Sequence, residues 1–311
     1  MSAAHTTDLF VHPALFYRDS DEYLSGTLGF IREGLAHGEP VAVSVPTGNL
    51  ALLRAELGSD ADSVRLLDMT IEGRNPGRII PGVLRAFADA HPAGRVRIIG
   101  EPIWADRSAT EYPACVQHEA LINAAFAGRE VTILCPYNTA ALPPEVLADA
   151  RATHPTLIDS SGESASSAYD PDQIVAMYNR PLAEPPAAAM LLAFDGAALS
   201  DIRHRAVDYA RNAGMAAERI VDLELVVAET TTNSVVHGGG SGTLALWVSQ
   251  GQLCCQISDS GHITNPLAGR LPAPARVSGG RGLLIVNQLA DLVRMHTGAQ
   301  GTTLYIRLPL V

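Results

Sequence analysis

Hydrophobic and polar positions divide the chain into two segments with different orders of elements. In the first segment, short apolar runs rich in β-branched residues alternate with longer stretches of helical spacing, a pattern typical of βαβ units and of a parallel sheet covered by helices. We therefore predict a RecA-like parallel-sheet α/β domain over residues 8–178. Its expected strands are 40–45, 64–68, 96–100 and 131–135, and its expected helices are 23–37, 49–57, 79–91 and 112–127.

The second segment, residues 190–311, has a different order of elements. Two helical patterns come first, strand-like runs follow, and a Gly/Pro-rich loop leads to one more helix and a last strand, which together predict an α/β sandwich with a largely antiparallel sheet. The expected helices are 199–214, 218–237 and 282–292, and the expected strands are 243–250, 253–259 and 302–308.

Two stretches lack periodicity. Residues 179–189 place three prolines among small residues, which predicts a stiff extended linker between the domains. Residues 159–172 are rich in Ser, Gly and Asp and are predicted to be a loop within the first domain, before helical spacing resumes at 174–178.

Composition narrows the classes of function. The 311 residues carry a formal charge of -11, and all 22 basic residues are arginine, which argues against direct nucleic-acid contact and excludes any step that needs a lysine. The four cysteines have no CxxC spacing and are expected to be reduced thiols in the core. No apolar run reaches the roughly 18 residues of a membrane span, so we expect a cytoplasmic protein without membrane contact.

One predicted helix carries a polar stripe. Glu229, Asn233 and His237 follow one another at intervals of four residues, which places them on one face. A neighbouring, mainly apolar stripe is expected to pack on the sheet and leave the polar face free for a ligand. This second stripe consists of Leu223, Val227, Thr230 and Ser234.

Three glycine motifs follow this helix in order. In Asp259-Ser-Gly261, a carboxylate at a strand end can accept from an exocyclic amine, while the glycine lets the backbone pass close to a ring. The run Ser278-Gly-Gly280-Arg281-Gly282 leads into an apolar helix, where exposed N–H groups suit a phosphate. Gly301-Thr302-Thr303 opens the last strand with two hydroxyls. Each motif alone is weak, but their order and spacing together point to a nucleotide.

This order resembles the N, G1, G2 and G3 boxes of the GHKL ATPases, over about 125 residues. The resemblance implies the Bergerat α/β sandwich with ATP and Mg²⁺ as cofactors. The run 229–238 and the short lid between 261 and 280 are most similar to the anti-sigma-factor serine kinases.

Carried over by position, the resemblance implies a role for each motif residue. Asn233 would be the Mg²⁺ ligand, and Glu229 the catalytic carboxylate that orients or deprotonates an attacking hydroxyl. Asp259 would bind the adenine amine. Other expected nucleotide contacts are Gly261 beneath the base, Gly280 and Gly282 beside the phosphates, Thr302 or Thr303 near adenine, and His237 and Arg281.

In the first domain, 41–49 occupies the place of a phosphate loop but lacks its motif. Residues 9–178 are similar to the MEDS sensory domain, named from methanogen and methylotroph regulators, which implies a small-molecule ligand. The residues expected to line its site at the strand ends are Glu101, Trp104, His118, Cys135 and Tyr137. The alternative is that these aromatic and histidine side chains belong to the core. A metal site of His118, Glu119 and Cys135 is not favoured, because no pair has the spacing of a known zinc motif.

The combined resemblance implies a regulator that binds a sigma factor or phosphorylates an anti-sigma-factor antagonist on Ser or Thr. Two alternatives stay open: a nucleotide-dependent binding module without kinase activity, and a soluble protein like a sensor histidine kinase, with His204 as its phosphoacceptor. Self-association as a homodimer is also left open.

Overall fold

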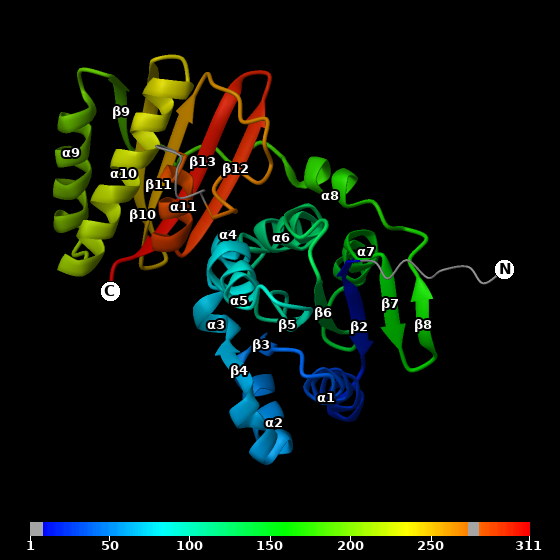
Figure 1. The fold of residues 1–311 in the computed structure, drawn as a ribbon. Coiled ribbons are helices and arrows are strands. Elements are labelled where there is room, and N and C mark those ends of the chain that lie inside the picture. Colours follow the sequence, from blue (N-terminus) through cyan, green and yellow to red (C-terminus); the bar gives the residue numbers. More distant parts are fainter. Residues whose placement is uncertain (1–8, 273–279) are drawn as a thin grey trace. The chain divides into compact units, whose positions relative to one another are not determined.

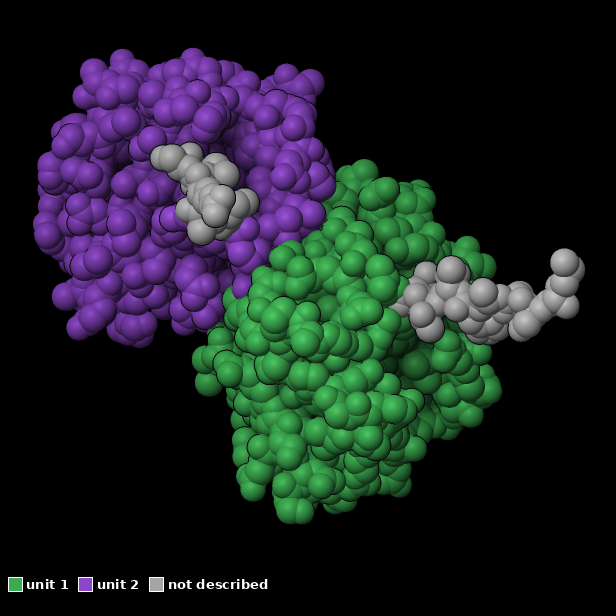
Figure 2. All heavy atoms as spheres, viewed as in Figure 1, with its two compact units in different colours: residues 1–73, 82–176 green, residues 74–81, 177–311 purple. Residues whose placement is uncertain are grey.

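The computed structural model describes residues 9–272 and 280–311. These residues form two compact units (Figure 2). Each unit has its own sheet. Unit 1 comprises 9–73 and 82–176, and unit 2 comprises 74–81 and 177–311. In both described ranges, no helix is long and apolar enough to cross a membrane.

The sheet of unit 1 is parallel from β4 to β7, with β8 antiparallel to β7 at one edge (Figure 1). Its order is β4-β3-β5-β6-β2-β7-β8, and β1 pairs with β6 off this path. The strands are β1 (Phe10–Val11), β2 (Pro13–Tyr17), β3 (Val41–Val45), β4 (Val64–Asp68), β5 (Val96–Gly100), β6 (Val131–Asn138), β7 (Thr156–Asp159) and β8 (Gly162–Ala165).

Capping residues in the sequence mark where some helices of unit 1 begin. Helix α1, for example, starts after Asp19, whose side chain accepts from the backbone N–H groups of Asp21 and Glu22, and its residues Thr27 and Ile31 are buried one turn apart. The helices are α1 (Ser20–Ala36), α2 (Thr47–Leu57), α3 (Met69–Glu72), α5 (Arg85–Ala90), α6 (Tyr112–Ala125), α7 (Pro144–Thr153) and α8 (Pro171–Tyr178), the last of which runs across the boundary between the units. A 3₁₀ turn η1 (Gly58–Ser63) follows α2.

Three expectations for the first domain need correction. The predicted helix 79–91 is divided: α4 (Pro76–Ile79) ends before a π-turn, η2 (Ile80–Leu84), and α5 follows. Pro81 lies in this turn, and a proline in a helix lacks the N–H that the α-helical ladder requires. The predicted loop 159–172 contains half of the β7–β8 hairpin. Strand β2, which is buried at every position, was not predicted.

Unit 2 is an antiparallel sheet of order β12-β13-β11-β10-β9 with helices packed on it (Figure 1). Its strands are β9 (Met190–Asp195), β10 (Ser241–Ser249), β11 (Gln252–Asp259), β12 (Leu292–Gly298) and β13 (Gly301–Pro309). Helices α9 (Leu199–Asn212) and α11 (Gly282–Leu289) both contact the central helix α10 (Ala217–His237), which also contacts β10, β11 and β13. The fold class predicted for both domains is confirmed.

The core of unit 2 explains the position of α10. Its predicted apolar stripe, Leu223, Val227, Thr230 and Ser234, is buried. Cys254 and Cys255 are buried in β11, and all four cysteines of the chain are free, as expected. The predicted helix 282–292 is too long: α11 ends at Leu289, Ala290 is extended, and Leu292 begins a strand, β12, that was not predicted.

Unit 2 also includes residues 74–81, which carry α4. The buried Asn75 side chain donates to the Asn287 carbonyl at 2.8 Å and accepts from the N–H groups of Gly77 at 3.0 Å and of Val293 at 3.3 Å. A Cβ on Gly77 would lie 1.9 Å from Asn287 Oδ1, so any other residue there would displace the Asn287 side chain. Asn75 therefore joins this segment to both α11 and β12.

Replacing Asn75 with Ala is expected to lower the stability of unit 2 by about 1–3 kcal/mol, because it leaves buried backbone groups without partners. The measurement is chemical denaturation followed by the fluorescence of Trp247, in a Trp104→Phe background that removes the other tryptophan. Gln288→Ala, at an exposed position of α11, is the control and should change the midpoint little. Equal midpoints for Asn75→Ala and the parent chain would contradict the inference.

Candidate functional site

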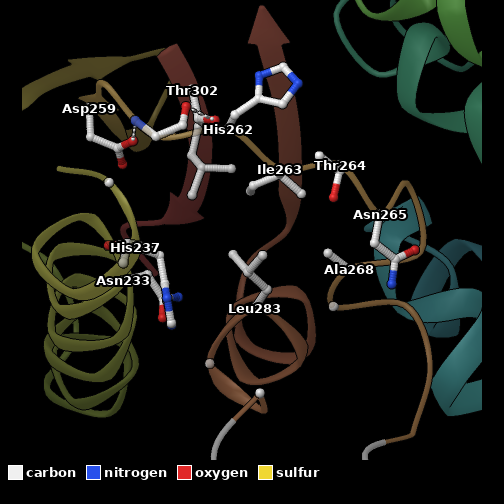
Figure 3. Close-up of a pocket in the computed structure, with 17 residues that line it drawn as sticks. Asn233, His237, Asp259, His262, Ile263, Thr264, Asn265, Ala268, Leu283 and Thr302 are labelled. Carbon is white, nitrogen blue, oxygen red and sulfur yellow. Dashed lines mark hydrogen bonds between the residues drawn. The ribbon is translucent and has the colours of Figure 1, made fainter.

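Unit 2 contains a cavity of about 480 Å³ between α10, the end of β11, the loop after it and the start of α11 (Figure 3). This volume lies within the range of small-molecule sites, about 300–1,000 Å³. The polar stripe of α10 and each of the three glycine motifs contribute at least one residue to its lining. The lining residues that had been predicted from sequence are Asn233, His237, Asp259, Gly261, Gly280, Gly282 and Thr302.

The carboxylate of Asp259 is held from two sides. Ser234 Oγ on α10 donates to its Oδ2 at 2.6 Å, and the Gly261 N–H donates to its Oδ1 at 2.9 Å. Each oxygen keeps a lone pair for a further donor, because a carboxylate oxygen accepts about two hydrogen bonds. Asp259 is therefore fixed in orientation and can still accept a hydrogen bond from a ligand.

Glycine is required where α10 ends against the turn after β11. A Cβ on Gly261 would lie 2.6 Å from both the Cα of Gly238 and the carbonyl oxygen of His237. A Cβ on Gly238 would in turn lie 2.4 Å from the Cγ of Asp259. Such contacts are too short for real side chains, so the glycine after Asp259 serves close backbone approach at the cavity wall.

Thr302 lies opposite Asp259 in the register of β11 and β13. Its hydroxyl donates to the Gly261 carbonyl at 3.0 Å and lies 3.0 Å from Thr297 Oγ1, which accepts from the Ile263 N–H at 3.1 Å. These hydroxyls hold the loop that follows Asp259. The sequence left Thr302 and Thr303 as alternatives; Thr302 lines the cavity, whereas the Thr303 hydroxyl lies 3.1 Å from Ser258 Oγ.

The polar stripe of α10 meets the first residues of α11. Asn233 and His237 line the cavity, and Glu229 lies beside it without being among the lining residues. A Cβ on Gly282 would fall 2.6 Å from Glu229 Oε2 and 3.1 Å from Asn233 Nδ2. Glu229 and Asn233 are thus both in contact range of Gly282, although they precede it by 53 and 49 positions in the sequence.

The carboxamide of Asn233 has no hydrogen bond to any residue in the described ranges. It is half-buried and faces the cavity (Figure 3). Its oxygen is therefore available to a ligand or to a metal ion that accompanies one.

The glycine run before α11 reaches the cavity through Gly280 and Gly282. Gly280 has a φ of +76°, a conformation that favours glycine. Arg281 between them is exposed and is not among the lining residues, so the structure does not bring it to the cavity. Ser278 and Gly279, the first two residues of the motif, lie outside the described residues.

The apolar wall of the cavity was missed by sequence reasoning. It is formed by Ile263, Ala268, Leu283 and Leu304. Leu283 follows the glycine run directly and Leu304 follows Thr302 by two positions on the same face of β13, so their places next to the motifs were the available signal. Ile263 and Ala268 belong to an irregular loop and had no periodicity to reveal them.

In unit 1, the five predicted ligand-site residues fall into separate surroundings. Glu101, directly after β5, accepts from Asn49 Nδ2 at 2.8 and 3.1 Å and from the Tyr17 hydroxyl at 3.2 Å. These three side chains gather near the carboxyl ends of β5, β3 and β2, the edge where ligands bind in open α/β sheets.

None of the other four is a hydrogen-bond partner of Glu101 within the described residues. His118, Cys135 and Tyr137 are buried around α6 and β6, each about 1% exposed. Trp104 is partly exposed, and the guanidinium of Arg107 lies 4.0 Å from the centre of its ring.

The surroundings of Glu101 generate a pH dependence. Burial raises its pKa from 4.5 to about 7, against the effect of the hydrogen bonds from Asn49 and Tyr17. Between pH 4.5 and about pH 7, the Glu101 carboxyl group binds more protons in the folded state than in the unfolded state. The contribution of Glu101 to stability therefore falls as the pH rises through this window, and is lowest above pH 7.

Glu101→Gln removes this titration. The stability of the variant relative to the parent chain is expected to increase by roughly 2–3 kcal/mol between pH 5 and pH 8. Denaturation midpoints measured across this range test it, with Glu163→Gln, an exposed carboxylate on β8, as the control. A constant difference between Glu101→Gln and the parent at all pH values would refute the assignment.

Comparison with known families adds to this geometry. Residues 11–155 match the model of the methanogen/methylotroph, DcmR sensory domain, abbreviated MEDS. Residues 192–308 match the model of the histidine kinase-like ATPase domain. No curated protein sequence matches the chain significantly.

One similar solved structure is that of the RsbU and RsbW domains of Rv1364c from Mycobacterium tuberculosis. It has 19% sequence identity and a TM-score of 0.31, and the match covers 40% of this chain and 33% of that one. This chain therefore spans about a third of that protein chain, and a likeness of this size carries no argument about function.

The first match covers the sheet of unit 1 as far as β6 and leaves out β7 and β8. The second match covers most of the sheet of unit 2 and every predicted residue of its cavity. The chain thus carries one segment similar to the MEDS sensory domain and a second segment similar to the histidine kinase-like ATPase domain.

Proposed function

We propose that the chain is a regulator in which an Mg²⁺- and ATP-dependent module binds a sigma factor, phosphorylates an anti-sigma-factor antagonist on Ser or Thr, or does both, under the control of the sensory domain. Binding of nucleotide with Mg²⁺ is general to the ATPase family that residues 192–308 match. The observation that carries the proposal is the meeting of Glu229 and Asn233 beside Gly282, next to the cavity.

The residues of unit 2 fit a magnesium nucleotide. Mg²⁺ prefers oxygen ligands, retains several waters and is usually bound by one or two protein groups together with substrate phosphates. The unengaged carboxamide of Asn233 supplies such an oxygen. Bound there, the ion would neutralise phosphate charge, which is its main contribution to phosphoryl transfer.

The opposite end of the cavity suits a purine. The fixed carboxylate of Asp259 can accept from an exocyclic amine, and Gly261 lines the cavity beside it. Ile263, Leu283 and Leu304 offer apolar contact to the ring. The distribution of polar and apolar groups thus matches a ligand with a flat base and an anionic tail.

Glu229 lies where a carboxylate could orient an attacking hydroxyl or accept its proton. Its carboxylate lies next to Asn233 on the same face of α10, one turn away. In transfer to a protein hydroxyl, such a carboxylate would accept the hydroxyl proton as the oxygen attacks phosphorus. A module that only binds nucleotide has less need of this group, which favours the kinase over the binding module.

Control by the sensory domain has a physical route through residues 74–81. This segment belongs to unit 2, yet the chain on either side of it belongs to unit 1. Asn75 contacts Asn287 on α11, and the first residue of α11, Gly282, lines the cavity. A sensed ligand would act by shifting the population of two arrangements, which requires different affinity for each.

Asn233→Ala is expected to weaken Mg²⁺-dependent ATP binding by about 10- to 100-fold, because one charge-assisted interaction of roughly 1.5–3 kcal/mol is lost. Calorimetric titration with ATP at fixed Mg²⁺ measures this change. Thr232→Ala, at the exposed neighbouring position, is the control and should bind like the parent. If Asn233→Ala binds ATP with unchanged affinity, the proposed role of Asn233 as a Mg²⁺ ligand is contradicted.

Glu229→Gln is expected to keep ATP affinity within a few fold and to slow phosphoryl transfer by about 10²- to 10⁴-fold, the usual contribution of general-base assistance. Labelled ATP, Mg²⁺ and a candidate antagonist protein provide the assay. Acid-stable label on the antagonist identifies Ser or Thr, whereas acid-labile label lost in His204→Ala would identify a histidine kinase. Nucleotide binding without any transfer in the parent chain would instead support the binding module.

A further inference from the structure

Four side chains from four elements of unit 1 meet at one buried point. His12 lies between β1 and β2, Glu119 on α6, Cys135 on β6, and His154 directly after α7. One ligand atom from each lies within 4.8 Å of the other three, and all four residues are buried. Neither the expected ATP chemistry nor the network around Glu101 uses this group.

Three of the six distances between these atoms are close to those of a tetrahedral site. His154 Nε2 lies 3.1 Å and His12 Nε2 3.6 Å from Glu119 Oε2, and His12 Nε2 lies 3.5 Å from Cys135 Sγ. Tetrahedral zinc, with bonds of about 2.0–2.1 Å to N and O and about 2.3 Å to S, sets its ligand atoms about 3.3–3.6 Å apart. Since all four ligand atoms lie within 4.8 Å of one another, shifts of about 1 Å would close the cluster around an ion.

The imidazole of His12 is oriented by a neighbour outside the cluster. Asn123 Nδ2 donates to the carbonyls of Ala120 at 3.1 Å and Thr153 at 2.9 Å, so its Oδ1 is free to accept. That oxygen lies 3.1 Å from His12 Nδ1, which must then carry the proton. The lone pair of neutral His12 is consequently on Nε2, the atom that faces the cluster.

His154 is oriented in the same way. Its Nδ1 lies 2.8 Å from the carbonyl oxygen of Ala150, which can only accept, so Nδ1 is the donor. The Nε2 lone pair points to Glu119. Metal-binding histidines characteristically donate their second ring nitrogen to a carbonyl or a carboxamide in this manner.

The polar atoms at the centre are not satisfied by hydrogen bonds. Within the described residues, both carboxylate oxygens of Glu119 and the Nε2 of His154 are buried without a hydrogen-bond partner. Two imidazole lone pairs that face a carboxylate would repel it, and burying an unpaired polar group costs about 1–3 kcal/mol or more. A cation at the centre would satisfy all of these atoms together.

We propose that this cluster is a binding site for a divalent ion of the zinc class, held by His12, Glu119, Cys135 and His154. Two nitrogens, one sulfur and one carboxylate oxygen suit Zn²⁺, whereas Mg²⁺ and Ca²⁺ prefer oxygen ligands. Four protein ligands close the coordination sphere, so the ion would be structural. Cys135 would bind as the thiolate and release its proton to solvent.

The sequence argument against a metal had considered a different set. His118 lies next to Glu119 along the chain, but its Nε2 is 4.0 Å from Glu119 Oε1 and is not a member of the cluster. His12 and His154 take its place. Because the ligands come from separate elements, no pair shows a zinc spacing in the sequence.

Metal content of the full chain tests the proposal. The protein purified after growth with added zinc is expected to contain about one zinc ion per chain by elemental analysis. Cys135→Ala should lower this content at least tenfold. Cys115→Ala is the matched control, since Cys115 is a buried cysteine on α6 outside the cluster, and it should retain the ion.

A second measurement does not depend on the folding of a variant. Chelator-treated parent protein should melt at a lower temperature, recover with Zn²⁺ but not with Mg²⁺, and give a thiolate-to-metal charge-transfer band with Co²⁺ that Cys135→Ala lacks. If the parent contains no metal, Zn²⁺ leaves its melting unchanged and Co²⁺ gives no such band, the proposal is overturned, and the cluster is an ion pair of protonated histidine with Glu119.

Discussion

The geometry of the cavity in unit 2 depends on the anchoring of Asp259. Ser234 on α10 and the backbone of Gly261 hold its two carboxylate oxygens, so one side chain ties the central helix to the end of β11 and to the turn that follows. The close packing of Gly238 against this turn allows the approach. If this junction opened, the helix carrying Glu229 and Asn233 would lose its alignment with the floor of the cavity.

Much of the architecture could be predicted because hydrophobic periodicity identifies helices and strands in strongly periodic segments. Strands β4 and β5 were predicted at their observed bounds, and α10 differed by one residue. Six strands, β1, β2, β7, β8, β9 and β12, were not predicted, and the reason can be given for two of them. β2 is buried on both faces and has no polar alternation, and β12 continues an apolar run after α11, where only the extended Ala290 separates helix from strand.

For the cavity, the spacing of glycines and carboxylates predicted lining residues correctly. Close backbone approach requires glycine, and a fixed hydrogen-bond acceptor requires a residue such as aspartate. The loop residue Ile263 gave no such signal, since many apolar residues could fill its place. The cluster in unit 1 was hidden for a related reason. Its members His12 and His154 lie near opposite ends of the domain sequence and come together only when β2 pairs with both β6 and β7.

The electrostatics of unit 2 constrain how it can hold a triphosphate. The chain has no lysine and a formal charge of -11, and Arg281, the arginine of the glycine run, is exposed. Asp259 and Glu229 add negative charge at the two ends of the cavity region. Backbone N–H groups at the start of α11 offer only partial positive charge. No arginine lines the cavity among the described residues, so in the proposed function the magnesium ion would supply most of the positive charge there, with the unengaged carboxamide of Asn233 as its partner.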